Sequence, residues 1–191
     1  MIVGIIPKII QPYKDQFEIA IDLNLFKFLN NIFPKSKIKI LFKKKNYQLD
    51  FLILSGGNTI TTFSKKKEDL LRSKIDNYYY NICEKKKIPI LGICHGAMFI
   101  AKKHNSKFLL KKHIGSHKIW IKKKNYTVNS FHNIIIKKIT KKFNIIATAK
   151  DDSIECFVNK KSPILGMMWH PERYQNFKKL DKRIIKQNLC S

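Results

Sequence analysis

The sequence has 191 residues, with 39 lysines and arginines against 13 aspartates and glutamates, a formal net charge of +26. A chain of this length can bury about two-thirds of its unfolded surface in one domain without disulfides or metal ions. The apolar residues 1–6 lack the basic leader and cleavage site of a signal peptide, and no stretch has the ~18 uncharged apolar residues of a membrane-spanning helix. We therefore expect one cytoplasmic domain over residues 1–191, with no membrane partner.

The basic charge alone would suggest a nucleic-acid partner, because cationic surfaces bind phosphates. Arginine is the residue that best recognises bases and phosphates, yet only three of the basic residues are arginine. Abundant lysine, isoleucine and asparagine are typical of a chain encoded by an AT-rich genome. We predict no nucleic-acid partner and keep an anionic substrate as the functional alternative.

Strands and helices alternate through the first half of the sequence. Short apolar runs predict buried strands at residues 1–6, 38–42, 51–54 and 88–93, and helical spacing predicts helices at residues 15–32, 68–87 and 97–104. This alternation favours an α/β fold with a mostly parallel sheet between helices.

The second half changes to short strands without long helices between them. We expect these strands at residues 108–110, 118–121, 126–129, 134–137, 145–149 and 153–158. They are typical of an antiparallel extension of the sheet. A last strand at residues 164–168 and a helix at residues 177–189 complete the predicted fold.

A cysteine between two glycines, Gly92-Ile93-Cys94-His95-Gly96, follows a predicted buried strand and begins a helix. This pattern is typical of a nucleophile elbow, in which small neighbours permit the sharp turn that presents the central side chain. At a helix N-terminus Cys94 meets unpaired N–H groups, which favour the attacking thiolate. We expect the backbone N–H of His95 to stabilise the oxyanion.

A histidine and a carboxylate, His170 and Glu172, follow the last predicted strand. Sites in α/β sheets lie at the carboxyl ends of strands, so we expect both residues near Cys94. Pro171 fixes the backbone between them. The set predicts Cys94 as nucleophile, His170 as base and Glu172 as the group that orients the base.

A glycine turn, Ser55-Gly56-Gly57-Asn58, ends another predicted strand. Flexible glycines allow such a turn to aim a backbone N–H at a substrate oxygen, which would give the second oxyanion donor.

The other cysteines and histidines do not have the spacing of a zinc site. We therefore expect no metal and no cofactor. Four histidines are interpreted as surface or packed residues: His104, His113, His117 and His132.

In this order these elements resemble the class I glutamine amidotransferase family, especially its free-standing γ-glutamyl hydrolases, over essentially the whole chain. Residues 128–132 and 152–155 also carry the resemblance. It implies a flavodoxin-like three-layer fold, the triad Cys94, His170 and Glu172, and an oxyanion hole from Gly57 and His95. It also implies that the substrate is bound by Gly56, Asn58, Ser130, Phe131 and His132.

Within this branch the sequence is similar to the γ-glutamyl-CDP-amidate hydrolases, which implies release of glutamate and a cytidine diphosphoramidate used on surface polysaccharide. Two positions depart from the family pattern. Met98 replaces a glutamine after the elbow, and Thr59 replaces an acidic residue after the glycine turn. Both departures favour a modified γ-glutamyl compound, with a phosphate-bearing leaving group, over free glutamine.

Other functions stay open from the sequence. The chain could hydrolyse another γ-glutamyl amine, or supply ammonia as the glutaminase subunit of a synthetase, which requires a partner. A catalytically silent binding module is a third alternative, against which the complete triad argues. The oligomeric state is open between a monomer and a homodimer.

Overall fold

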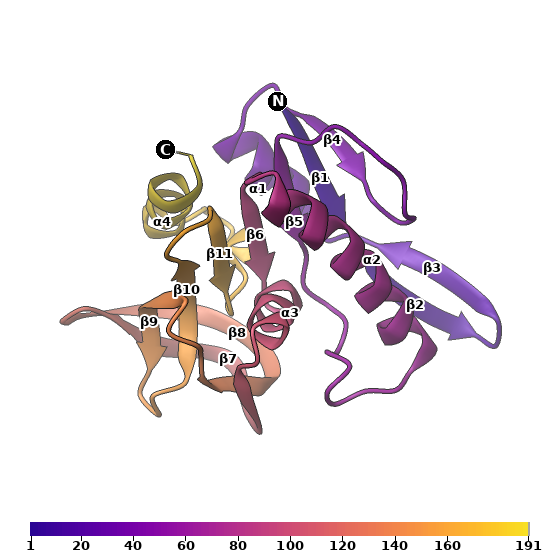
Figure 1. Ribbon diagram of the computed structural model, residues 1–191. Helices are drawn as coiled ribbons and strands as arrows, with labels where there is room; N and C mark the ends of the chain where they lie inside the picture. The colour runs from indigo at the N-terminus through magenta and orange to yellow at the C-terminus, as the bar shows by residue number, and fades with distance from the viewer. Residues whose placement is uncertain (191) are drawn as a thin grey trace.

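The computed structural model, which describes residues 1–190, has a nine-stranded sheet of order β4-β1-β5-β6-β11-β10-β8-β7-β9 (Figure 1). The parallel part consists of β4 (Lys37–Ile40), β1 (Ile2–Ile6), β5 (Phe51–Leu54), β6 (Ile90–Ile93) and β11 (Ile164–Met167). Every residue of β5, β6 and β11 is buried. Continuous apolar runs of this kind require cover on both faces of the sheet.

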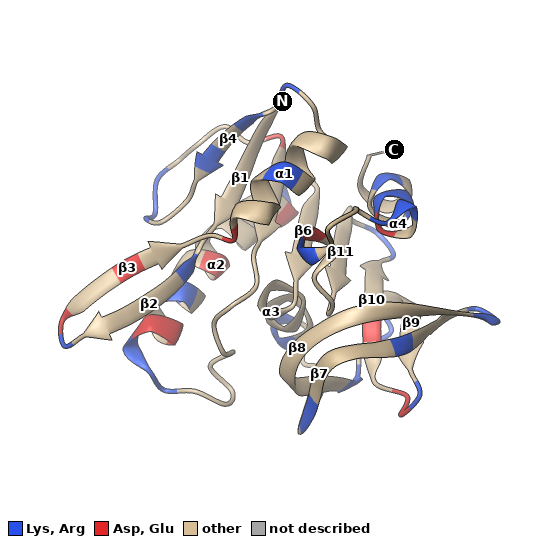
Figure 2. Cartoon of the chain, turned by 180° about the vertical axis from the view of Figure 1, so that it is seen from behind, with Lys and Arg blue, Asp and Glu red and all other residues tan. Residues whose placement is uncertain are grey.

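Helices provide that cover. In Figure 1, α2 (Lys67–Lys85) and α3 (His95–Lys103) lie on one face, while α1 (Leu23–Ile32) lies on the other, as the reverse view in Figure 2 shows. Phe28 of α1 packs edge-to-face on Phe177, just before α4 (Lys179–Leu189). The predicted three-layer α/β fold is confirmed. Within residues 1–190, no helix combines the length and apolarity needed to cross a membrane.

The antiparallel part consists of β7 (Lys107–Ile121), β8 (Lys124–Lys138), β9 (Phe143–Ala149) and β10 (Ile154–Asn159). Strand β10 joins β11 in antiparallel fashion, and β9 pairs with both β7 and β10, so these four strands close into a ring. The predicted antiparallel extension is confirmed. Four of its predicted short strands merge into one long hairpin, β7–β8, because a bulge between Leu110 and His113 bends the strand without ending it.

The helix predicted at residues 15–32 is wrong in its first half. Residues Gln16–Ala20 form β3, which pairs with β2 (Lys8–Tyr13) in a hairpin that projects from the sheet at the right of Figure 1. Asp15 turns the chain with φ 66°, and Asp22 then caps α1 by accepting a hydrogen bond from the Asn24 N–H. The apolar spacing that predicted one helix therefore continues from β3 into α1, although these are two separate elements. Ile19 of β3 is 48% exposed.

Basic residues are spread over the molecule. Figure 2 shows Lys and Arg on α4, on β4 and at the turn between β7 and β8, as well as on α2. The basic residues that this view shows therefore lie on several separate elements.

The contact between α3 and the sheet leaves no room for a side chain at Gly96. A methyl group there would overlap the carbonyl group of Leu54 in β5. Because backbone atoms cannot move aside as a flexible side chain can, this contact fixes how closely α3 approaches the sheet.

We expect Gly96→Ala to lower the free energy of unfolding by about 3 kcal/mol, through overpacking. Alanine is the better helix former by about 1 kcal/mol, so propensity cannot cause a loss. Gly4→Ala in β1 is the matched control, because its added methyl would meet only the side chains of Leu41 and Leu49. Urea denaturation of both variants measures the difference, and equal losses would contradict the packing argument.

Candidate active site

The elbow between β6 and α3 has the strained geometry that the sequence predicts. Cys94 has φ 50° and ψ −100°, a conformation that non-glycine residues rarely adopt. Its N–H donates to the Met167 carbonyl of β11 at 2.7 Å, and its carbonyl accepts from the Met98 N–H at 3.0 Å. These bonds to a neighbouring strand and to α3 hold the cysteine at the carboxyl end of the sheet.

The structure brings His170 and Glu172 to the same place. The Nδ1–H of His170 donates to the Oε1 atom of Glu172 at 2.6 Å, and the exposed fractions of the two residues are 2% and 3%. Gly56 lies beside them: a methyl group there would come within 2.6 Å of the His170 Cε1 atom and 3.5 Å of the Cys94 Cβ atom. Glycine is therefore required for the close approach of loop, cysteine and histidine.

The environment of His170 favours its protonated form. Burial by itself lowers the pKa, but hydrogen bonds with the Cys94 sulfur and the Glu172 carboxylate outweigh burial and raise it to about 9 from an ordinary 6.5. A protonated imidazole beside sulfur is the arrangement that activates a cysteine and later donates a proton to a leaving group. Linkage gives the sign: this proton stabilises the fold fully below pH 6.5, and its contribution is lost as pH rises through about 9.

Asn129 of β8 holds the backbone of His170 in place. Its Oδ1 atom accepts from the His170 N–H and its Nδ2 atom donates to the His170 carbonyl, both at 2.8 Å, while its own N–H donates to the Tyr174 hydroxyl at 3.0 Å. Sequence reasoning assigned this asparagine no role, although it lies in the segment that carries the family resemblance. Its contact spans 41 residues and is created only by the fold.

The two expected oxyanion donors lie on the loops that meet at the elbow. Gly57, with φ 122°, lines the same cavity as Cys94, and His95 is the first residue of α3. The buried ring of His95 joins these loops, because its nitrogens lie 2.8 Å from the Asn58 carbonyl oxygen and 2.9 Å from the Asp76 Oδ2 atom. Both partners are hydrogen-bond acceptors.

A buried ion pair supports these loops from behind. Arg72 donates from Nε to Asp76 at 2.8 Å and from Nη2 to the Ser55 carbonyl at 3.0 Å, with both charged side chains fully buried. Burial tends to raise the pKa of Asp76, but Arg72 and His95 outweigh it and lower the pKa. No sequence pattern indicated this pair, since Arg72 and Asp76 look like ordinary helix positions.

Two hollows meet at His170. One has a volume of 320 Å³ and contains Cys94, and the other has a volume of 250 Å³ and contains Glu172. Lys8, Gly57, His170 and Arg173 line both. A substrate bond placed at Cys94 would therefore have one group on each side, with two cationic side chains at the junction.

The predicted binding residues divide into those at the cavity and one behind it. Phe131 and His132 line the larger hollow, and the Phe131 ring meets His170 edge-on at 5.6 Å between centroids. Asn58 also lines it, but its side-chain amide is engaged with the backbone of Ile9. Ser130 does not line it, because its fully buried hydroxyl donates to the His113 carbonyl at 2.7 Å. Alternation along β8 places the Ser130 side chain on the opposite face of the strand from Phe131.

The two departures from the family pattern also lie at this cavity. Met98 and Thr59 both line the larger hollow, and Met98 is 4% exposed. The substitutions therefore change the surface that a substrate would contact.

Comparisons with known proteins identify the class. Residues 17–190 match the model of the family described as glutamine amidotransferase class-I, and the chain belongs to this family. It is 39% identical over 142 residues to a γ-glutamyl-CDP-amidate hydrolase of Campylobacter jejuni, covering 67% of this chain and 69% of that protein.

A second relative, a glutamine-hydrolysing GMP synthase subunit of Thermoplasma acidophilum, is 30% identical over 135 residues, covering 65% of this chain and 64% of that protein. A solved structure from the same organism, provisionally described as a GMP synthase subunit, gives a TM-score of 0.71 at 23% identity, covering 99% of this chain and 92% of that one. This last likeness supports the fold alone.

We expect the His170 ring to titrate near pH 9 in the native protein, as measured by NMR of the imidazole nitrogens. Glu172→Gln should lower that pKa, since the neutral amide stabilises the imidazolium less. His104 is an internal control, because its pKa is lowered mainly by burial and it lies near Glu84, away from the triad. A His170 pKa near the ordinary 6.5, or one that Glu172→Gln leaves unchanged, would contradict the electrostatic account.

Proposed function

We propose that this protein is a cysteine hydrolase that cleaves a γ-glutamyl amide bond and releases glutamate. The observation that carries the proposal is the geometry at the elbow: the strained Cys94 lines the same cavity as the buried His170, whose Nδ1 atom lies 2.6 Å from the Glu172 Oε1 atom. Membership of the class I glutamine amidotransferase family supports the same chemistry.

The reaction begins when the Cys94 thiolate attacks the γ-carbonyl carbon and forms a C–S bond. The backbone N–H groups of Gly57 and His95 stabilise the resulting oxyanion. His170 donates its proton to the leaving nitrogen, the C–N bond breaks, and a γ-glutamyl thioester remains on Cys94. His170 then takes a proton from water, the hydroxide attacks the thioester, and glutamate departs as the thiolate is restored. Glu172 orients and stabilises the imidazolium throughout.

The substrate we propose is a γ-glutamyl compound whose leaving group carries phosphate. The C. jejuni relative is named for γ-glutamyl-CDP-amidate, and Met98 and Thr59 alter the cavity where this chain departs from the family pattern. Lys8 and Arg173 border both hollows, and Arg173 pairs with Asp22 at 2.9 Å, so we assign the contact with a phosphate next to the scissile nitrogen to Lys8. The product would be a cytidine diphosphoramidate, made in the cytoplasm for surface polysaccharide.

A second candidate is the glutaminase subunit of a synthetase. Similarity to the GMP synthase subunit of T. acidophilum favours it. The two candidates differ in substrate and in their need for a partner. A glutaminase hydrolyses free glutamine and delivers ammonia to a partner. The proposed hydrolase prefers the phosphate-bearing amide and needs no partner. Measuring glutamate release from both compounds with the purified chain separates them.

For a γ-glutamyl substrate, Cys94→Ala and His170→Ala should each lower kcat by at least about 10⁴-fold, because either loss disables the nucleophile. Glu172→Gln should cost roughly a hundredfold less, since it orients the base without replacing it. Circular dichroism checks that each variant folds. Substantial turnover by folded Cys94→Ala, or equal residual rates for the two other variants, would contradict these roles.

For the phosphate-bearing substrate, kcat/KM should fall as salt rises, because screening limits electrostatic attraction to about 8 Å near physiological ionic strength. A neutral γ-glutamyl amide should respond much less. Lys8→Ala should lower kcat/KM for the charged substrate and reduce its salt dependence, whereas Lys186→Ala on α4 removes the same charge away from both hollows and serves as the control. If kcat/KM depended on salt equally for the two substrates, the lysines would reflect the composition of the genome and would not attract the substrate.

A further inference from the structure

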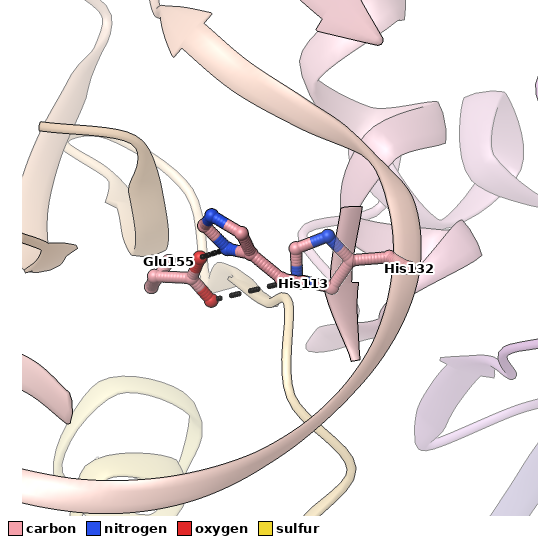
Figure 3. Close-up of side chains that lie close together, drawn as sticks. All are labelled: His113, His132 and Glu155. Atoms are coloured by element: carbon pink, nitrogen blue, oxygen red, sulfur yellow. Dashed lines mark hydrogen bonds and ion pairs between the residues drawn. The ribbon is translucent and has the colours of Figure 1, made fainter. Parts of the chain in front are cut away.

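A second group of ionisable side chains lies outside the triad. His113 of β7, His132 of β8 and Glu155 of β10 each offer one atom to a common point, and these atoms all lie within 4.8 Å of one another (Figure 3). His113 Nδ1 is 3.2 Å from Glu155 Oε1, and His132 Nε2 is 3.8 Å from Glu155 Oε2. Spacing along the sequence did not reveal the group, because the antiparallel register places His113 opposite His132.

Several polar atoms of this group are buried without a hydrogen-bond partner in the part of the chain that the structure describes. The side chains of His132 and Glu155 are each 1% exposed, yet both ring nitrogens of His132 and the Oε2 atom of Glu155 have no hydrogen-bond partner among residues 1–190. The same holds, within that range, for the buried ring nitrogens of His117. Buried polar atoms are almost always hydrogen-bonded, so the unpartnered His132 Nε2 and Glu155 Oε2 atoms, 3.8 Å apart, indicate that they share one ligand.

The distance between His132 and Glu155 fits a shared ion better than direct contact. A separation of 3.8 Å is too long for a hydrogen bond. Ligands that each lie about 2.0–2.1 Å from a tetrahedral metal ion are separated by about 3.4 Å. The separations are 3.2 Å from His113 to Glu155 Oε1 and 3.8 Å from His132 to Glu155 Oε2, and the ligand atoms all lie within 4.8 Å of one another, so the side chains would move inward to bind an ion.

An outer layer already orients the first of these histidines. His113 Nε2 lies 3.2 Å from the Asp151 Oδ2 atom, which leaves Nδ1 directed toward Glu155. Asp151 is itself held by Ser153, whose hydroxyl donates to Oδ1 at 2.6 Å. A carboxylate on the distal nitrogen of a histidine is the usual support of a metal ligand, where it fixes the tautomer and the ring orientation.

We propose that His113, His132 and Glu155 bind a divalent transition-metal ion, with His117 as the fourth ligand. His117 Nε2 lies 3.5 Å from Glu155 Oε1, and its ring packs beside that of His113. Three imidazoles and one carboxylate form a set that suits Zn²⁺. A surface hollow of 390 Å³ borders His113 and His117, and Lys111, Lys118, Lys150 and Asp151 also line it.

The ion would hold together the wall of the active-site cavity. Its ligands come from β7, β8 and β10, and β8 also carries Asn129 and Phe131, which contact His170. The competing arrangement has only shared protons: burial tends to raise the pKa of Glu155, but the three neighbouring histidines outweigh burial and hold that pKa well below its usual range. A proton network of this kind needs no metal, so binding must be measured.

The experiment uses the full chain with Cys94→Ala, which removes the thiolate that could bind the metal at the triad. After treatment with a chelator and dialysis, calorimetry with Zn²⁺ should give one ion per chain, and Zn²⁺ should raise the melting temperature. Co²⁺ should give the intense visible absorption of a tetrahedral site.

Variants locate the site. His132→Gln and Glu155→Gln should each weaken binding by at least tenfold, and Asp151→Asn, which alters only the outer layer, should weaken it by about tenfold while keeping the fold. His104→Gln is the matched control outside the group and should bind like the parent. No Zn²⁺ binding by the folded parent, or binding that all three site variants retain unchanged, would overturn the proposal.

Discussion

The structure depends on one tight turn, in which α3 begins directly against the ends of the parallel strands. Gly96 allows the helix to touch the Leu54 carbonyl, and the N–H of Cys94 reaches across to Met167 of β11. Because the chain must pass through φ 50° at Cys94, the side chain is held in one direction. The energy stored in this conformation is offset by burial of the strands and helix on both sides of the turn.

Polar contacts buried around that turn then set the positions of the surrounding loops. The Arg72–Asp76 pair and the ring of His95 connect α2, the glycine loop and the start of α3, while Asn129 fixes the backbone of His170 from the antiparallel side. Buried ion pairs contribute little net stability compared with apolar packing, but removing one partner leaves an uncompensated charge that costs about 3–5 kcal/mol. Such groups therefore fix the positions of the loops more than they stabilise the fold.

The sequence predicted the features that are local and missed those that depend on pairing across the chain. Alternating apolar runs predicted the three-layer fold, and the Cys94 elbow and the His-Pro-Glu segment could be recognised because each motif is contiguous. The β2–β3 hairpin was missed because Phe17 and Ala20 extend the apolar spacing of α1, although Phe17 is 39% exposed. The contact of His113 with His132 is set by strand register, and that of Asn129 with His170 by the packing of the fold; residue spacing reveals neither.

Covalent catalysis by Cys94 can be tested by trapping the acyl-enzyme. The purified protein is mixed with a γ-glutamyl nucleotide amidate, quenched in acid within the first turnover, digested and analysed by mass spectrometry. A nucleophilic Cys94 predicts a γ-glutamyl group on the peptide that contains this residue, and none on the other cysteines. Alkylation of Cys94 should abolish glutamate release. Release at the normal rate by the alkylated chain, or by the unmodified chain with no adduct on Cys94 at any quench time, would contradict the mechanism.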